Sequence, residues 1–214
     1  NFQKINSQDL YIDDFFVYDI NAVTAWSSWF FDDFNRTNGP VGNGWTVFGS
    51  AGQIVSSAYA TTGTSDGGRA VLRNTGITNG RQRIVGEIKS PSAHEQGLIL
   101  CGNSAGTQGL IVRATQTNAK IFRYSSALTG NPPTWTELGI NGGNVGFATG
   151  DLVTFEVVDG AAYVWKNSDI LAAYAENVHA VVPASNSWAG AFVSRTFPGI
   201  DSGSWENVRI LQAA

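Results

Sequence analysis

Charged residues, methionine and paired cysteines are all scarce in this chain of 214 residues. Lys, Arg, Asp and Glu make up only 14% of it, Met is absent, and Cys occurs once. Long charged side chains and Met favour helices, so their scarcity argues against a helical protein. The single Cys101 cannot form an internal disulfide. Because it ends the apolar run 97–101, we interpret it as a buried apolar residue rather than a reactive thiol.

Positive charge and long apolar runs are lacking as well. The formal net charge is −4. Nucleic acid is therefore not expected as the main partner, because binding to phosphates requires a clustered basic surface. Membrane insertion is not expected either, because no apolar run approaches the length of about 20 residues that spans a bilayer.

Turn formers are mixed with β-branched and aromatic residues, which favours short strands joined by tight turns. The strongest local signal is Asp159-Gly160, flanked by β-prone runs over residues 154–158 and 161–165. Asp-Gly accepts positive φ at both central positions of a two-residue turn, so it predicts a type I′ β-hairpin. A third strand over residues 170–174 is expected to extend the hairpin into an antiparallel meander.

Short β-prone segments recur along the rest of the chain. Residues 82–89 alternate between two kinds of side chain, which suits a sheet with one wetter face. Further segments, separated by Gly-rich turns, are 96–101, 109–114, 120–124, 189–194 and 205–211. Short strands with turns every ~8–12 residues are typical of a sandwich or barrel. We predict an all-β fold, an antiparallel β-sandwich.

The first 20 residues raise the question of a second domain. Residues 10–19 resemble the last predicted strand, 203–211, because both read aromatic, acid, acid or amide, and then an apolar alternation. One interpretation is that residues 1–20 are the closing strand of a preceding, similar domain, with 21–27 as a linker and 28–214 as the β-sandwich. The alternative is that residues 1–20 are an N-terminal extension of one domain.

Two segments carry a resemblance to a known family. Residues 30–45 read FFDDFNRTNGPVGNGW, and residues 205–208 read WENV. They resemble the opening and closing strands of concanavalin A-like, laminin-G-like jelly-roll domains. In tandem with an Ile-Asp-Asp-type closing strand, this opening looks like the C-terminal domains of bacteriophage minor tail proteins. The same pairing occurs in secreted bacterial proteins that bind or degrade glycans.

The resemblance implies a structural and adhesive module of a phage tail, located in the virion. Such a module would contact a host-surface glycan or other tail proteins, and tail symmetry would make it a homo-oligomer. One alternative is a secreted bacterial carbohydrate-binding module attached to an enzyme. Another is a hydrolase whose catalytic carboxylates are not recognisable in the sequence.

Catalysis is not expected. A retaining glycosidase needs two carboxylates about 5–5.5 Å apart, which alternate acids along one strand would supply because their side chains share a face. The chain has no such run, since its glutamates are isolated from one another. His94 and His179 are the only imidazoles, and neither lies in a metal-ligand spacing or near a nucleophile elbow.

Glycan binding would use exposed aromatic rings, because a flat ring stacks on the apolar face of a pyranose. The candidates are Trp135, which follows the loop residues Pro132 and Pro133, together with Tyr124 and Phe197. Structural packing remains the alternative for each of them. The strand-like contexts of four other tryptophans predict core positions: Trp45, Trp165, Trp188 and Trp205. The candidate donors for an acidic glycan are Arg69, Arg81 and Arg195, for which scattered surface positions are the alternative.

A structural calcium ion near the termini is also implied by the resemblance. Calcium takes six to eight oxygen ligands, often carboxylates and loop carbonyls. By this resemblance the candidate ligands are Asp32, Asp33 and Asp201, with Asp66 as a loop alternative. Solvated acids in turns are the other interpretation of these residues.

Overall fold

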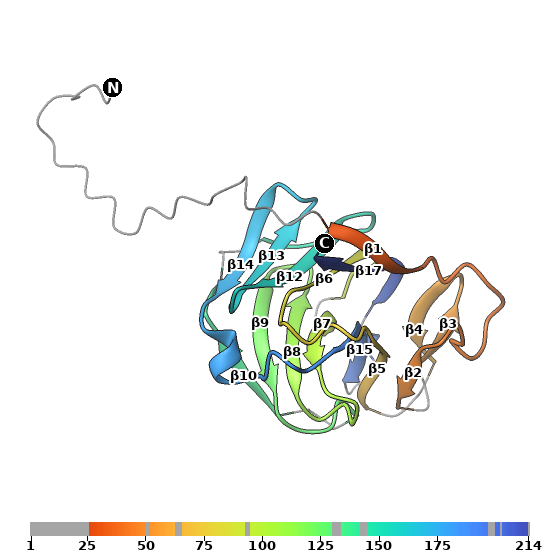
Figure 1. Ribbon diagram of the computed structural model, residues 1–214. Helices are drawn as coiled ribbons and strands as arrows, with labels where there is room; N and C mark the ends of the chain where they lie inside the picture. Colours follow the sequence, from red (N-terminus) through yellow and green to blue (C-terminus); the bar gives the residue numbers. More distant parts are fainter. Residues whose placement is uncertain are drawn as a thin grey trace, which may run out of the picture.

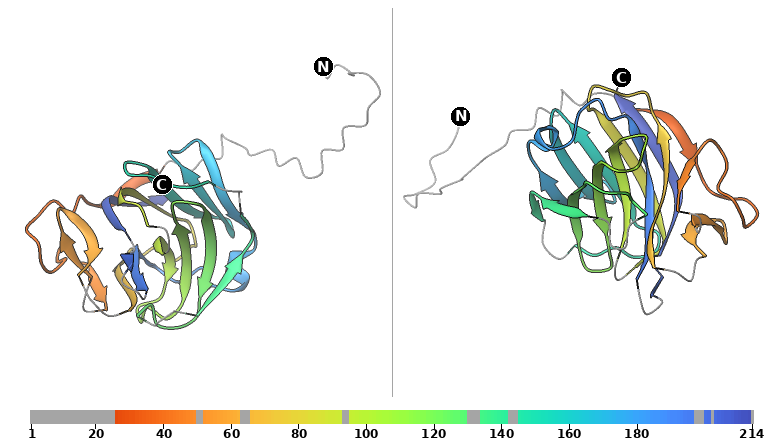
Figure 2. Two further views of the ribbon diagram at one scale, coloured as in Figure 1. Left: turned by 180° about the vertical axis from the view of Figure 1, so that it is seen from behind. Right: turned by 90° about the horizontal axis from the view of Figure 1, so that it is seen from below.

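The chain folds into two facing antiparallel β-sheets (Figure 1 and Figure 2). The computed structural model describes residues 26–49, 52–62, 66–92, 95–129, 134–141, 145–196, 200–201 and 203–213. The predicted all-β sandwich is confirmed. Within the described ranges, no helix is long and apolar enough to cross a lipid bilayer.

We call the sheet that contains both the first and the last described strand sheet A. Its strands follow the order β11 (Ile140–Asn141), β14 (Ile170–Ala175), β13 (Ala161–Lys166), β12 (Leu152–Val158), β6 (Gln82–Ser90), β17 (Ser204–Ala213), β4 (Ala58–Thr61) and β3 (Gly52–Val55). In addition, β1 (Trp26–Asp32) pairs with the second half of β17. The closing strand thus has neighbours on both sides.

Sheet B forms the other layer. Its strands follow the order β10 (Trp135–Leu138), β9 (Ala119–Tyr124), β8 (Gly109–Ala114), β7 (Gln96–Gly102), β15 (Trp188–Thr196), β5 (Gly67–Asn74) and β2 (Thr46–Phe48), and β16 (Ile200–Asp201) pairs with β15. The view from behind in Figure 2 shows β7 to β10 side by side. A short 3-10 helix, η2 (Val178–Ala180), follows β14.

The local predictions for the central meander are confirmed. Asp159 and Gly160 take φ values of 49° and 83° between β12 and β13, as a type I′ turn requires. Strand β6 alternates between buried and half-buried residues over most of its length, so one face packs on the core and the other faces outward. The strand predicted at 170–174 is β14.

The opening strand differs from the sequence-based expectation. It starts at Trp26, so Trp26 and Ser27 belong to β1 rather than to a linker, and they pair with Ala213 and Gln212. It ends at Asp32, and two residues later Phe34 takes a positive φ of 56°, outside the extended region of the backbone. Residues 1–20 lie outside the described part of the chain, so their assignment to a preceding domain stays a prediction.

The core lies between the two sheets and draws apolar side chains from both. Trp205 is fully buried there, and its Nε1 donates a hydrogen bond to the carbonyl oxygen of Phe192 at 3.0 Å. Trp45 is buried as well, so the predicted core positions of these two residues are confirmed. Trp165 and Trp188 are only half-buried, since both belong to outward-facing positions of their strands.

Candidate functional site

The outer face of sheet B is concave. Trp135 lies on β10 and Phe192 on β15, four strand positions away. In a flat sheet this separation would be about 19 Å, at 4.7–4.9 Å per strand. The two ring centroids are nevertheless only 5.5 Å apart, and Phe122 on β9 lies 5.4 Å from the same indole. The sheet must therefore curl so that outward-facing residues of distant strands meet.

A second apolar cluster fills the middle of this concave face, separate from the core between the sheets. Its buried members are Ala70, Leu72, Ile99, Ile111, Phe122, Tyr124, Leu128 and Phe192. Leu128 comes from the segment after β9, which folds back over the sheet, and its N–H donates to the carbonyl oxygen of Gly106 at 3.0 Å. Phe48, Trp135 and Trp188 pack around the cluster and are partly exposed.

Tyr124 belongs to the buried part of this cluster. Its exposed fraction is 0%, and burial raises the pKa of its phenol well above the usual range. The ring lies over Gly109, the residue opposite it on β8, where a Cβ atom would come within 2.6 Å of the phenol oxygen. The prediction that Tyr124 stacks on a sugar is therefore wrong, because the ring fills the space left by a glycine. Phe197 lies outside the described residues.

Trp135 remains accessible at the edge of the same cluster. The structure pairs it with Tyr124 across β9 and β10, so two of the three predicted aromatic residues are neighbours. The indole is half-buried, and its Nε1 has no hydrogen-bond partner among the described residues. Because the Nε1 atom itself is buried, a bound molecule would meet the exposed part of the ring and not this N–H.

Charged side chains border Trp135 on the concave face. Lys120 on β9 binds Glu137 on β10, with Nζ–Oε distances of 3.0 and 3.3 Å. Arg113 on β8 stands opposite Lys120, and its guanidinium carbon lies 5.1 Å from the centroid of the Phe122 ring. The face thus combines a partly exposed indole with donors and acceptors, which is the chemistry that a sugar ring requires.

The sequence interpretation missed Phe122, Phe192 and Arg113. Phe122 could have been found, because the alternation along β9 places it on the same face as the predicted Tyr124. The contribution of Phe192 depends on the curvature of the sheet, which no local pattern reveals. Of the three arginines suggested by the sequence, Arg81 lies away from this face. It precedes β6 of sheet A and binds Asp159, in the turn between β12 and β13 of the same sheet, at 2.7 Å.

Asp32 serves the opening loop instead of a cation. It is 2% exposed and accepts five hydrogen bonds from four residues. Arg36 donates through both terminal nitrogens at 2.7 and 2.9 Å, and the indole of Trp45 donates at 2.7 Å. A carboxylate has about four lone-pair sites, so none is left for calcium. The predicted calcium role of Asp32 is corrected to that of a structural acceptor.

The other predicted calcium ligands do not join Asp32. Asp33 is exposed, and its Oδ1 accepts a hydrogen bond from the backbone N–H of Asn35 at 2.9 Å. Asp201 is in β16, paired with Arg195, and its side chain lies outside the described atoms. The described residues contain no group of three or more His, Cys, Asp or Glu that could hold a metal ion.

Cys101 is fully buried in the core between the sheets. Burial raises the pKa of its thiol to about 12, so at neutral pH the group is protonated and inert. The interpretation of Cys101 as a buried apolar residue is confirmed. His179 lies in η2, half-buried, with Nδ1 3.2 Å from the carbonyl oxygen of Val182.

No protein-family model matches this chain, and no curated protein sequence is significantly similar to it. Solved structures do match. The carbohydrate-binding module CBM66 from Bacillus subtilis superposes with a TM-score of 0.52 and 13% identity, over 79% of this chain and 96% of the module.

Two further similar structures have different roles. The Bacillus licheniformis beta-glucanase gives a TM-score of 0.53 at 10% identity, over 88% of this chain and 99% of that enzyme. The exoplasmic/lumenal domain of VIP36, in its Ca2+/Man3GlcNAc-bound form, gives 0.53 at 10% identity, over 79% and 85%. At these identities the likeness extends to the fold alone. The chain has a concanavalin A-like jelly-roll fold.

Proposed function

We propose that this chain is a non-catalytic module that binds a host-surface glycan on the concave face of sheet B. The observation that carries the proposal is the position of Trp135. Its indole is partly exposed, and the Lys120–Glu137 pair joins the same strand, β10, to the adjoining strand β9. An indole stacks on the apolar side of a sugar ring while charged groups bond to its hydroxyls.

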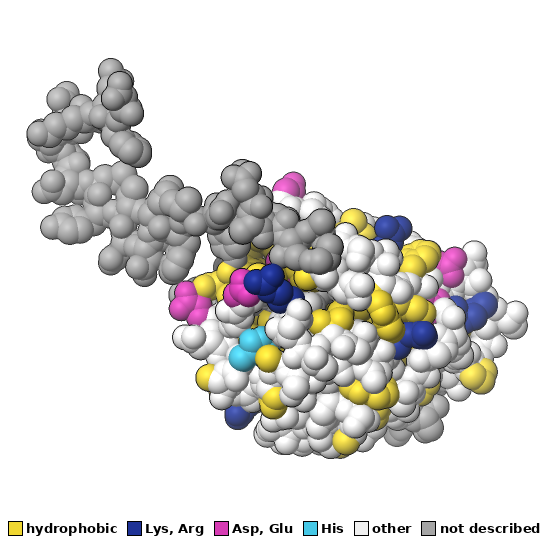
Figure 3. All heavy atoms as spheres, viewed as in Figure 1, with side chains coloured by type: hydrophobic (Ala, Val, Ile, Leu, Met, Phe, Trp, Pro, Cys, Tyr) yellow, Lys and Arg dark blue, Asp and Glu magenta, His cyan; other side chains and the backbone are white. Residues whose placement is uncertain are grey.

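The similar structures support the proposal by analogy. One is named as a carbohydrate-binding module, and another was solved with Man3GlcNAc bound. The charge distribution does not suggest nucleic acid as the partner. On the face of the molecule seen in Figure 3, basic side chains of the described residues are scattered singly or next to acidic ones. Nucleic acid would favour one continuous basic surface.

Retention on immobilised host-envelope polysaccharides tests the proposal. We expect the wild-type chain to be retained and Trp135→Leu to lose about two- to tenfold in affinity, as loss of one ring stack of about 0.5–1.5 kcal/mol predicts. Leucine keeps apolar contact with Phe122 and Phe192 but removes the flat ring. Trp165→Leu is the matched control, because Trp165 is also half-buried but lies on the outer face of sheet A. Equal retention of both variants would contradict the assignment of the face.

The proposal that the module is not an enzyme depends on the acids of the same face. Glu137 binds Lys120, while Glu95, which precedes β7, accepts a hydrogen bond from Ser194 Oγ at 2.8 Å. These two carboxylates thus bond to different partners on different strands. Incubation with the retained polysaccharide should release no new reducing ends. Release that disappears in Glu137→Gln would instead support the hydrolase alternative.

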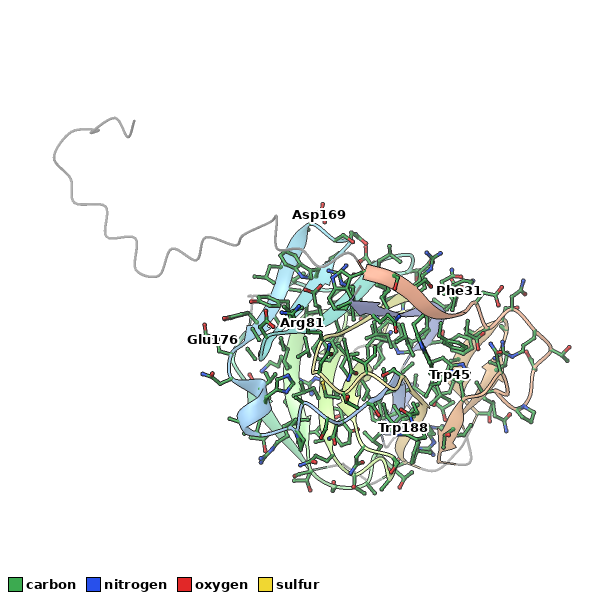
Figure 4. All side chains as sticks on the ribbon, in the orientation of Figure 1. Phe31, Trp45, Arg81, Asp169, Glu176 and Trp188 are labelled. Atoms are coloured by element: carbon green, nitrogen blue, oxygen red, sulfur yellow. The ribbon has the colours of Figure 1, made fainter. Side chains whose placement is uncertain are left out.

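The outer face of sheet A supports contact with other tail proteins, as the phage-tail interpretation requires. A register row crosses it from Leu171 through Trp165, Thr154, Val85 and Arg209 to Phe31. Phe31, near the end of β1 (labelled in Figure 4), and Leu171 are each 43% exposed. Exposed apolar side chains in one row favour a protein partner. Phe31→Glu should abolish binding to the neighbouring tail protein. Self-association of this chain would be detected separately, by light scattering.

The phage-tail role and the secreted alternative differ in their genetic context. A phage tail module located in the virion predicts genes for tail proteins beside its own gene. A secreted carbohydrate-binding module predicts an export signal and a catalytic domain in the full-length gene. Reading the full-length gene with its neighbours therefore decides between the two, and neither outcome changes the assignment of the glycan-binding face.

A further inference from the structure

Arg113 is a cation without an acceptor on the concave face of sheet B. Its Nε is buried and has no hydrogen-bond partner among the described residues. The contact that its guanidinium does make is with the ring face of Phe122, at 5.1 Å. Other arginines are engaged: Arg36 binds Asp32, and Arg81 binds Asp159. Because buried donors are almost always paired in folded proteins, the unpaired Nε requires an explanation.

A second cation stands directly beside Arg113. Lys120 is its cross-strand partner on β9, so the two side chains leave the sheet on the same face. Like charges in this arrangement repel each other unless an anion compensates. Glu137 binds Lys120 and supplies one negative charge. These three side chains together therefore carry a net charge of +1, in a chain whose formal net charge is −4.

The position on the other side of Arg113 is closely packed. Its cross-strand partner on β7 is Gly97, and a Cβ atom there would come within 3.0 Å of the Ile111 side chain and within 2.3 Å of the carbonyl oxygen of Val112. Phe192 follows Gly97 in the same row, on β15. Because Gly97 is buried and the Ile111 side chain fills the space above it, a ligand group would reach the Arg113 guanidinium from the side of Lys120.

We propose that Arg113, assisted by Lys120, binds an anionic substituent of a polysaccharide. This inference rests on the proposed glycan-binding function and adds the class of glycan. Carboxylate, sulfate and phosphate groups each present two neighbouring oxygen atoms, which a guanidinium fork can bind through two parallel hydrogen bonds. Lysine contributes a point charge, and Trp135 remains available to stack on a neighbouring sugar ring.

Matched pairs of polysaccharides test the inference and separate the sources of the anion. Polygalacturonate and its fully methyl-esterified form differ in the carboxylate, while dextran sulfate and dextran differ in the sulfate. Affinity electrophoresis of the full chain measures binding to each. We expect at least one anionic member to bind more tightly than its neutral counterpart, with the difference shrinking at high salt because charge attraction is screened.

Arg113→Gln should lower the affinity for the anionic polysaccharide about tenfold or more, as loss of a charge-assisted hydrogen bond of about 1.5–3 kcal/mol predicts, and leave any neutral affinity unchanged. Arg209→Gln is the matched control, because Arg209 also lies over an aromatic ring, Phe31, but on sheet A. If Arg113→Gln does not fold, Lys120→Gln takes its place.

The outcomes distinguish the two proposals. Equal binding of charged and neutral members, unaffected by Arg113→Gln, would overturn the anionic preference and leave glycan binding intact. Absence of binding to all four probes and to host-envelope polysaccharide would overturn glycan binding, and the anionic preference with it. An equal loss in Arg113→Gln and Arg209→Gln would show a general charge effect and would also overturn the role of Arg113.

Discussion

Replacing Asp32 by asparagine removes a buried negative charge on which five hydrogen bonds converge. The asparagine side chain has nearly the same shape, but its NH₂ group must face donors such as Arg36 or Trp45, and the Arg36 guanidinium loses its counter-ion. Removing one partner of a buried charge pair typically costs about 3–5 kcal/mol. For a chain of this size, each kcal/mol lowers the melting temperature by roughly 2–4 °C. We therefore expect a fall of roughly 6–20 °C.

Thermal and urea unfolding, followed by circular dichroism, measure this change. Asp33→Asn is the matched control, because Asp33 is adjacent in sequence but exposed, and one backbone N–H donates to it. Substitutions at such positions usually change stability by no more than about 0.5 kcal/mol. If Asp32→Asn and Asp33→Asn shift the unfolding midpoint equally, the assignment of Asp32 as the anchor of the opening loop is refuted.

Three further predictions concern pH, thiol chemistry and metal. Burial opposes ionisation of Asp32, but hydrogen bonds from Arg36 and the Phe34 N–H outweigh it and lower its pKa. The stabilisation by the charged form is present above the unfolded pKa of about 3.9 and is lost as pH falls through the lower folded value. When melting temperature is measured between about pH 7 and about pH 2, Asp32→Asn should therefore lose this part of the pH dependence. Cys101, with a pKa of about 12, should react with a maleimide only as fast as the chain unfolds; labelling in native buffer at the rate of free cysteine would contradict its burial. A chelator should leave the melting temperature unchanged, because the lone pairs of Asp32 are occupied; a fall that Asp33→Asn abolishes would instead support calcium.

Features that depend on neighbouring residues could be predicted from the sequence. The Asp159-Gly160 turn is determined by two residues that accept positive φ, and the alternation along β6 reports which face is buried. The β10 tryptophan, Trp135, was also identified, since it follows a proline-containing loop. These signals act over a few residues, so the rest of the chain does not alter them.

The end of the opening strand could not be predicted in the same way. The family resemblance places the opening strand at residues 30–35, yet the extended backbone stops at Asp32. The side chain of Asp32 accepts the Phe34 N–H at 2.8 Å and simultaneously binds Trp45, 13 residues further on. The turn therefore depends on a contact formed only when the loop closes, and the same contact removes Asp32 from any metal site.

The concave face shows why the sequence could not separate its buried aromatic residues from its accessible ones. Lys120, Phe122 and Tyr124 share one face of β9 by simple alternation, so the sequence treats them as equally exposed. Curvature of the sheet separates them. Phe122 and Tyr124 are buried in the apolar cluster with groups from β10, β15 and the segment around Leu128, while Lys120 is half-buried beside Arg113. Since curvature acts across strands that are distant in sequence, the exposed member of such a triplet is decided by tertiary structure. Mutations of Lys120, rather than of Phe122 or Tyr124, should therefore change ligand preference without loosening the apolar cluster.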